Sequence, residues 1–382
     1  MECNSTGKIE HCSESVILGC FGPDIVRDSR GISFSMPGSF VSLRVKGANK
    51  LCMEMYGGNN YFRVEITELE TKSQQCYVIS PERSFVGWVN ICDNLFAHRE
   101  YHIDVIKLTE PMLRSLVTRS HPVEITRVRI DQGSFVEQDW ESLMFPQGWL
   151  EVIGDSDVCG FGVGGPITSP HNLLSMDPAK EDATKAWGCL LAELFALGNR
   201  GALILGASGK GVVRNAPMCG PETIPEMWNR LKSDPTVIRL RSKPRAVVLL
   251  VGGNDFFDHA GPDDEIFINT YSKFLSDIRD THGKKVPIFV FQCSETCASS
   301  AGSPTCHPME DETVGEISDK LGIMTMAAVE SCGGAKERIF FEMIRERLSL
   351  DDYGLMMHWN VKGQSKIAAY MARFIREQSV GL

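Results

Sequence analysis

The 382-residue chain lacks the features that mark membrane, nucleic-acid-binding and disordered proteins. It has no apolar run near the ~20 residues that a transmembrane helix needs. Its formal net charge is −10, from 39 basic and 49 acidic side chains, so it gives no support for a nucleic-acid partner, which would favour a basic surface. With 43% apolar and 23% charged residues, the composition predicts a folded, soluble globular protein.

No secretory signal is visible in the N-terminal stretch. Residues 1–10 have neither a basic segment nor an apolar one, so we expect a soluble protein of the cytosol or of an organelle. The 13 cysteines are an odd number, thinly spread along a chain large enough to bury a core. This pattern favours reduced thiols over a disulfide framework. Partial pairing in a secretory compartment stays open.

The length predicts two domains, because a single core rarely grows beyond about 250–300 residues. In the first, residues 1–140, short stretches alternate apolar and polar residues and are separated by turn residues such as Pro37-Gly38. This alternation predicts a β-sandwich of the jelly-roll type. We expect residues 131–147 to connect the two domains. The predicted strands lie within residues 31–47, 51–56, 61–67, 76–79, 86–89, 101–107 and 126–130.

Residues 141–382 change to an alternation of strands and helices. Continuous apolar strands with helices between them predict an α/β domain, a parallel sheet covered by helices on both faces. We expect a last strand over Gly322–Val329. The other predicted strands are 150–153, 202–206, 246–251 and 286–291, and the predicted helices begin near 177, 221, 263 and 361.

A serine follows the first of these strands, in Gly154-Asp155-Ser156. A serine at the carboxyl end of a buried strand is held on a rigid support and faces solvent, as a nucleophile must be. The spacing is not Gly-x-Ser-x-Gly, because Val158 occupies the place of the second glycine. The alternative is a turn serine that hydrogen-bonds the nearby backbone.

Three further segments complete a candidate acyl-transfer site, since the ends of parallel strands meet at one edge of a sheet. The Gly209 amide, the Asn254 side chain and the Ser156 amide would form an oxyanion hole, and His358 would act as the base. Each has a structural alternative: a strand-to-helix turn, a helix cap, or a packed histidine. A phosphate-binding loop is rejected because Gly211 follows Lys210 where Ser or Thr is required.

Together these segments resemble the SGNH (GDSL-type) hydrolases. Gly154-Asp155-Ser156 is similar to the block with the nucleophile, Gly209 to the second-block glycine, Gly253-Asn254-Asp255 to the third block, and His358 to the catalytic histidine. The preceding β domain extends the resemblance to carbohydrate esterase family two, which joins a jelly roll to an SGNH domain. The resemblance implies hydrolysis of a small ester or an acetylated glycan, without cofactor or metal. It leaves the oligomeric state open.

The chain departs from this family in two places around the histidine. Leu355 stands where an Asp is usual, so the carboxylate that orients the base is missing locally. Some relatives work with a Ser-His dyad whose imidazole is held by a backbone carbonyl. Asp351, Asp352 or a remote residue is the alternative. The second departure is His358-Trp359 in place of Trp-His-Pro, and Trp359 and Phe256 are candidate substrate contacts.

Two competing hypotheses follow from these departures and from the cysteines. Without the orienting carboxylate, the protein would be a weak or inactive SGNH-fold subunit that binds or assembles. Three thiols and an imidazole in a Gly/Ser-rich segment, Cys293, Cys297, Cys306 and His307, are candidate zinc ligands. Their spacing is irregular and the last two are adjacent, so we predict no metal site.

Overall fold

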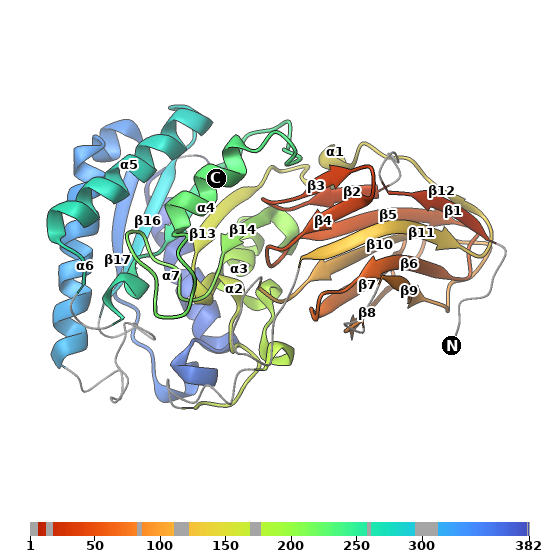
Figure 1. Cartoon of the computed structure of the whole chain (residues 1–382), viewed down its shortest axis with the longest axis horizontal. Helices are drawn as coiled ribbons and strands as arrows, with labels where there is room; N and C mark the ends of the chain where they lie inside the picture. The colour runs from red at the N-terminus through yellow and green to blue at the C-terminus, as the bar shows by residue number, and fades with distance from the viewer. Residues whose placement is uncertain are drawn as a thin grey trace. The chain divides into compact units, whose positions relative to one another are not determined.

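The computed structural model has an all-β unit and an α/β unit, as the sequence predicted (Figure 1). The first compact unit comprises residues 1–146 and 234–241, and the second comprises 147–233 and 242–382. No helix among the described residues is long and apolar enough to cross a bilayer. The structure describes residues 7–12, 18–81, 86–110, 122–168, 177–257, 261–294, 312–379 and 381.

The β unit consists of two six-stranded antiparallel sheets, ordered β3-β4-β11-β6-β9 with β1 on β11, and β12-β5-β10-β7-β8 with β2 on β5. Their inward side chains form one apolar core. A single short helix, α1 (Trp140–Met144), follows them. The strands are β1 (Lys8–His11), β2 (Leu18–Phe21), β3 (Val26–Asp28), β4 (Gly31–Phe34), β5 (Phe40–Lys46), β6 (Leu51–Tyr56), β7 (Phe62–Glu68), β8 (Gln74–Ile79), β9 (Gly87–Cys92), β10 (Glu100–Lys107), β11 (Val123–Ile130) and β12 (Ser134–Phe135).

Strand β7 shows why these residues form a sandwich. Phe62, Val64 and Ile66 are buried, and the residues between them are partly exposed, which is the period of two that a strand with one wet face requires. The register places Ile66 opposite Ile103 of β10, so apolar side chains of adjacent strands meet on the inner face. The alternation read from the sequence therefore fixes which face is buried.

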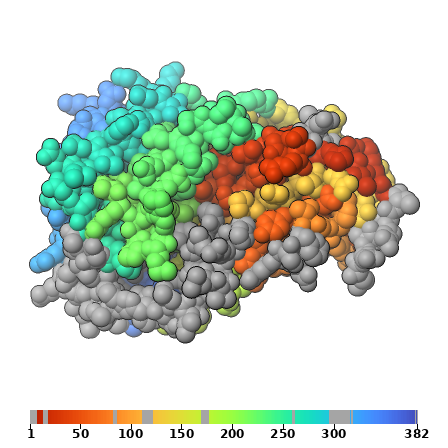
Figure 2. Space-filling model, in the orientation of Figure 1, coloured from red at the N-terminus to blue at the C-terminus, as the bar shows by residue number. Residues whose placement is uncertain are grey.

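The α/β unit has a five-stranded parallel sheet ordered β14-β13-β15-β16-β17. Its helices cover both faces, and α4 and α5 form much of the surface coloured green to cyan in Figure 2. The strands are β13 (Leu150–Gly154), β14 (Ala202–Gly206), β15 (Ala246–Leu250), β16 (Ile288–Cys293) and β17 (Ile339–Ile344). The α-helices are α2 (Ser156–Cys159), α3 (Trp187–Leu194), α4 (Ile224–Ser233), α5 (Asp264–His282), α6 (Glu312–Ser331) and α7 (Val361–Glu377).

The order of the strands sets the position of the site. The chain runs from β13 to β14 on one side and then returns to β15 on the other side of β13. In open parallel sheets, ligands bind outside the carboxyl ends of the strands at the point where the order reverses. Here that point lies beyond Gly154 of β13 and Leu250 of β15, directly before Ser156 and Asn254.

The predicted last strand is wrong, because Gly322–Val329 lies inside helix α6 and the last strand is β17. Leu321, Met324 and Ala328 are buried, whereas Ile323 and Met326 are exposed. This burial has the period of a helix with one apolar face. A short apolar run does not by itself distinguish a strand from a buried helix segment.

A buried ion cluster holds helix α4 and the end of α5 to the start of β13. The carboxylate of Glu151 accepts from Trp228 Nε1 at 3.0 Å, and lies 2.8 Å from Lys232 Nζ and 2.5 Å from His282 Nε2. Burial by itself raises the pKa of Glu151, but Lys232 and His282 outweigh it and lower the pKa to about 2. The cluster therefore stabilises the fold through the charged carboxylate.

We expect Glu151→Gln to lower the free energy of unfolding by about 3 kcal/mol, because Lys232 loses its buried counter-charge. Since the folded pKa is depressed, this stabilisation is present above the ordinary carboxyl pKa and is lost as the pH falls toward 2. Urea unfolding at pH 7 and at pH 3 measures both effects. An equal deficit of the variant at the two pH values would contradict the assignment.

Candidate active site

Ser156 begins helix α2 directly after β13. Its side chain is 4% exposed, and Asp155 caps the helix by accepting from the Asp157 amide. Gly154 allows the close turn, since a Cβ there would lie 2.9 Å from the carbonyl oxygen of Leu250. The hydroxyl is therefore held by a rigid strand end, as the sequence predicted.

The imidazole of His358 reaches the hydroxyl of Ser156. Nε2 lies 2.8 Å from Ser156 Oγ, and Nδ1 lies 3.1 Å from the backbone carbonyl oxygen of Met356. A carbonyl only accepts, so Nδ1 carries the proton and Nε2 is left as the acceptor for the serine proton. The Phe161 ring packs edge-on against the imidazole, with centroids 4.5 Å apart. The His358 ring thus connects the Ser156 hydroxyl, at Nε2, to the Met356 carbonyl, at Nδ1.

The Met356 carbonyl owes its direction to an unusual backbone. Met356 and Met357 both have positive φ, 52° and 60°. Two consecutive left-handed residues without glycine cost free energy and persist only when the surrounding structure enforces them. The Leu355 amide donates to the Gly162 carbonyl, and the Gly354 amide donates to the His358 carbonyl at 2.7 Å. These contacts fix the loop that presents the base.

Two backbone N–H groups are available as oxyanion donors. Among the described residues, neither the Ser156 amide nor the Gly209 amide donates a hydrogen bond. Gly209 has φ of +73°, and a Cβ at this position would lie 2.2 Å from Cys219 Sγ. Only glycine therefore fits this backbone position.

Asn254 follows β15, as predicted, but its amide is already engaged. Nδ2 donates to Asp155 Oδ2 at 2.8 Å and to the Lys210 carbonyl at 3.1 Å, which accounts for both of its hydrogens. A role in the oxyanion hole therefore requires Asn254 to share or exchange one of these bonds.

Two buried carboxyl groups hold the loops around Ser156. The carboxylate of Asp255 accepts from the amides of Val212, Val213 and Arg214 at 2.7 to 2.9 Å, and so fixes the chain that follows Gly209. Burial raises the pKa of Asp255 to about 6, against the effect of these bonds. Burial also raises the pKa of Asp155 to about 7, and Asp255 adds to the rise.

Comparison with known proteins places this arrangement in a recognised fold. No protein-family model and no curated protein sequence matches the chain. Among solved structures, a family two carbohydrate esterase from Cellvibrio japonicus has a TM-score of 0.73 at 17% identity, covering 98% of each chain. A carbohydrate esterase family 2 enzyme from Corynascus thermopiles has a TM-score of 0.70 at 21% identity, covering 95% of this chain and 99% of that one.

The chain has the fold of the family two carbohydrate esterases. An acetyl xylan esterase from Butyrivibrio proteoclasticus also shares it, with a TM-score of 0.66 at 15% identity over 98% of this chain and 99% of that one. The predicted fold, a jelly roll followed along the chain by an SGNH hydrolase-type domain, is confirmed. At these identities the likeness establishes architecture, so the roles of individual residues depend on the geometry described above.

Two residues predicted to contact substrate lie in the core of this esterase fold. Trp359 and Phe256 are each 1% exposed. Phe256 packs against Phe267, with centroids 6.2 Å apart, and Trp359 belongs to the cluster beneath helices α3 and α7. Their aromatic rings are enclosed by protein, so neither offers a face on which a sugar could stack.

The proposed carboxylate substitutes for the missing Asp have other partners. The carboxylate of Asp352 accepts from the Ser349 amide at 2.8 Å and from Lys366 Nζ at 2.7 Å, which makes it a loop cap and an ion pair. The side chain of Asp351 is exposed. The group found at His358 Nδ1 is the Met356 carbonyl.

The zinc hypothesis lies mostly outside the described residues. Cys293 ends β16 and is half-buried, while Cys297, Cys306 and His307 are not described. Within the described ranges, no group of three or more His, Cys, Asp or Glu side chains is arranged to hold a metal ion.

Sequence reasoning did not find Phe161 or Asp255 as supports of the site in this esterase fold. Phe161 lies among the glycines after Ser156, where its contact with a histidine about 200 positions away leaves no local pattern. The role of Asp255 could have been predicted from the sequence. A carboxylate next to Asn254 at the end of a strand is well placed to accept hydrogen bonds from the backbone amides of a neighbouring loop.

We expect Asp155→Asn to change the pH dependence of stability. Because the folded pKa of Asp155 is raised, ionising it costs stability as the pH rises from its ordinary value to about 7. Relative to wild type, the variant should therefore gain stability as the pH rises from 4 to 8. Urea unfolding at both pH values measures this gain. A constant difference between the proteins would show that Asp155 does not titrate in this range.

Proposed function

We propose that the protein is a serine esterase that removes acetyl-type groups from a carbohydrate. The observation that carries the proposal is the 2.8 Å contact between His358 Nε2 and Ser156 Oγ, with Nδ1 on a backbone carbonyl. A hydroxyl, a base with a fixed tautomer and two free amide donors are the groups that acyl transfer needs.

The reaction would proceed in two halves. His358 Nε2 takes the Ser156 proton as Oγ attacks the ester carbonyl, and the amides of Ser156 and Gly209 stabilise the oxyanion. Collapse breaks the C–O bond, and the imidazolium gives its proton to the departing alcohol. Water, deprotonated by the same imidazole, then attacks the acyl-serine and releases acetate. The chain's own groups supply each proton transfer.

The Met356 carbonyl would take over part of the role that an aspartate has in a Ser-His-Asp triad. It fixes the tautomer and the orientation of His358, because Nδ1–H must point at the Met356 oxygen. It carries no net charge, so it stabilises the imidazolium less than a carboxylate would. We therefore expect a competent esterase whose rate depends strongly on how rigidly this loop is held.

The substrate class is inferred from proteins of the same fold, which include an acetyl xylan esterase and several carbohydrate esterases. We expect activity on acetylated xylo-oligosaccharides and on aryl acetates. Esters of longer acyl groups serve as the comparison. A higher kcat/KM for the acetate ester than for the longer ester shows a preference for acetyl.

A fluorophosphonate probe separates this proposal from the alternative of an inactive binding subunit. Such probes react with an activated serine, so stoichiometric labelling that maps to Ser156 supports the esterase. Folded protein that takes up no label and hydrolyses no acetate ester would favour the binding subunit. Circular dichroism of the same sample verifies that the protein is folded.

A further inference from the structure

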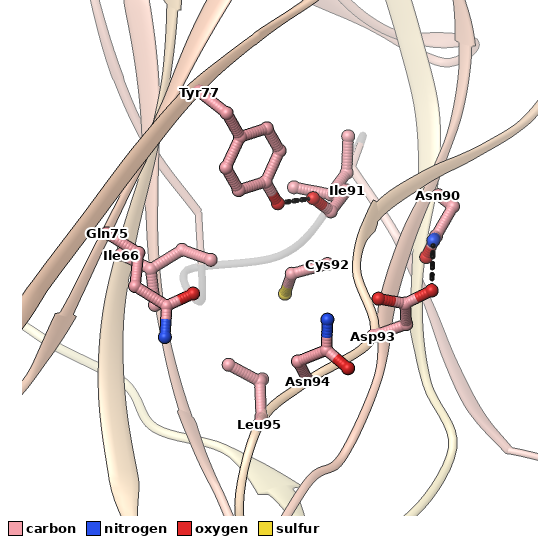
Figure 3. A pocket seen from close by; sticks show the side chains of 9 residues that line it. All are labelled: Ile66, Gln75, Tyr77, Asn90, Ile91, Cys92, Asp93, Asn94 and Leu95. Carbon is pink, nitrogen blue, oxygen red and sulfur yellow. Dashed lines mark hydrogen bonds between the residues drawn. The ribbon is translucent and has the colours of Figure 1, made fainter.

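A cavity of about 150 Å³ lies in the β unit, a different unit from the one that holds Ser156 and His358. It forms where the edge strand of each sheet faces the other, β8 from one sheet and β9 from the other (Figure 3). Its lining residues come from β7, β8, β9 and the turn that follows β9: Ile66, Gln75, Tyr77, Asn90, Ile91, Cys92, Asp93, Asn94 and Leu95.

The walls of the cavity are fixed by hydrogen bonds. The Tyr77 hydroxyl donates to the Ile91 carbonyl and so joins the two edge strands across the cavity. Asn90 Nδ2 donates to Asp93 Oδ2 at 3.0 Å, and the Leu95 amide donates to the Asn49 carbonyl at 3.1 Å. The cavity is therefore built into the sandwich before any ligand arrives, which limits the entropy lost on binding.

The floor is apolar and the rim is polar. Ile66, Leu95 and Cys92 are buried at 3%, 6% and 6% exposure. Gln75 and Asn94 are exposed, and their side chains make no hydrogen bond with the described residues. Figure 3 shows the Gln75 and Asn94 side chains on two sides of the Cys92 thiol.

The chemistry of the lining excludes most ligand classes. Among the described residues that line the cavity, Asp93 is the one ionisable carboxylate and none is Lys, Arg or His, so an anion would be repelled. Calcium needs about six to eight oxygen ligands, more than one carboxylate and these amides supply. Burial raises the pKa of Cys92 to about 12, which keeps the thiol protonated and unsuited to soft metals. A wholly apolar ligand would strip water from Asp93 without replacing its hydrogen bonds.

A neutral ring that carries hydroxyl groups satisfies every part of the lining. Its hydroxyls donate to the Asp93 carboxylate and exchange hydrogen bonds with the amides of Gln75 and Asn94. Its C–H face packs on Ile66 and Leu95. A cavity of about 150 Å³ accommodates one six-membered ring, as an apolar cavity of that size does for benzene.

We propose that this cavity binds a single sugar ring, at a site that shares no residue with the Ser156 and His358 site. The ring is a free monosaccharide or the terminal unit of a glycan, which share the same hydroxyl chemistry. Binding one ring with few contacts gives a dissociation constant in the millimolar range.

The test is titration of the full chain with xylose, glucose, mannose, galactose and xylotriose, followed by calorimetry and saturation-transfer NMR. We expect at least one sugar to saturate the protein. Asp93→Ala should weaken its binding by about tenfold or more, since a bond to a charged acceptor is lost, and Gln75→Ala by about threefold to tenfold. Tighter binding of xylotriose than of xylose identifies a glycan end as the ligand.

Gln74→Ala is the matched control. Gln74 is an exposed neighbour on the same strand, but it pairs with Thr67, whereas Gln75 pairs with the buried Ile66 and therefore points inward. Sugar binding that is equal in the Gln74→Ala and Gln75→Ala proteins would place the sugar elsewhere, including at Ser156, and overturn the proposal. Failure of every sugar to saturate, or saturation by calcium that Asp93→Ala abolishes, would also overturn it. Loss of esterase activity plays no part in these readouts.

Discussion

Replacing Ser156 with alanine is expected to lower kcat/KM for an aryl acetate by roughly 10⁴-fold to 10⁶-fold. The variant loses the proposed attacking atom, Oγ, which lies 2.8 Å from His358 Nε2. The oxyanion donors and the binding surface remain, so a small residual rate above that of water should persist. Initial rates with an aryl acetate and with an acetylated xylo-oligosaccharide measure the effect on both substrate types.

Ser365→Ala is the matched control for this result. Ser365 is exposed on helix α7 and donates to the Val361 carbonyl within the same helix. Its removal should leave both rates and the thermal midpoint almost unchanged. A Ser156→Ala protein that hydrolyses acetate esters at the wild-type rate would remove Ser156 from the mechanism and with it the proposed function.

Gly209→Ala is the second large effect, with kcat/KM reduced by about 10²-fold to 10³-fold, the loss expected when one oxyanion donor is displaced. The new Cβ would lie 2.2 Å from Cys219 Sγ on a backbone with φ of +73°. Cys219 and the strained backbone at Gly209 must therefore adjust, and we expect this adjustment to displace the Gly209 amide. We expect kcat to fall far more than KM rises, because the amide acts on the charge of the transition state.

Two further variants separate displacement of the donor from general strain. Gly198 has a φ of +77°, and no atom lies within 4 Å of the position that a Cβ would take there. Gly198→Ala therefore introduces the same backbone strain without a collision, and this variant should keep its activity. Cys219→Ala removes the nearest colliding atom, so in its background Gly209→Ala should recover part of the lost rate. Unchanged kcat in the single Gly209→Ala protein would exclude its amide from the oxyanion hole.

The sequence predicted where the candidate site residues lie, because each of them is at the end of a recognisable strand or beside the start of a helix. The apolar runs before Ser156 and Asn254 form neighbouring strands β13 and β15, and parallel topology brings their ends together. His358 precedes α7 (Val361–Glu377), which begins where the sequence predicted. Local patterns of this kind persist because propensity and burial agree.

The errors occurred where burial, and not local pattern, decides. Gly322–Val329 is apolar enough for either a strand or a helix, and only packing against the sheet selects the helix. Phe256 and Trp359 stand next to site residues in sequence but point into the core. The side on which an aromatic ring lies follows from backbone direction at a strand end, which residue spacing does not encode.

By itself the sequence determined the two classes of domain and the order of the strand-end loops that carry Ser156, Asn254 and His358, because these follow from periodicity and from residue type. Only the tertiary structure decided which group orients His358, which acceptors the Asn254 amide hydrogens bind and where in the β unit a cavity forms. Each of these depends on contacts between residues far apart in the chain, such as Met356 turned into a left-handed conformation so that its carbonyl faces the imidazole. Such contacts are fixed by packing, and packing is a property of the folded whole.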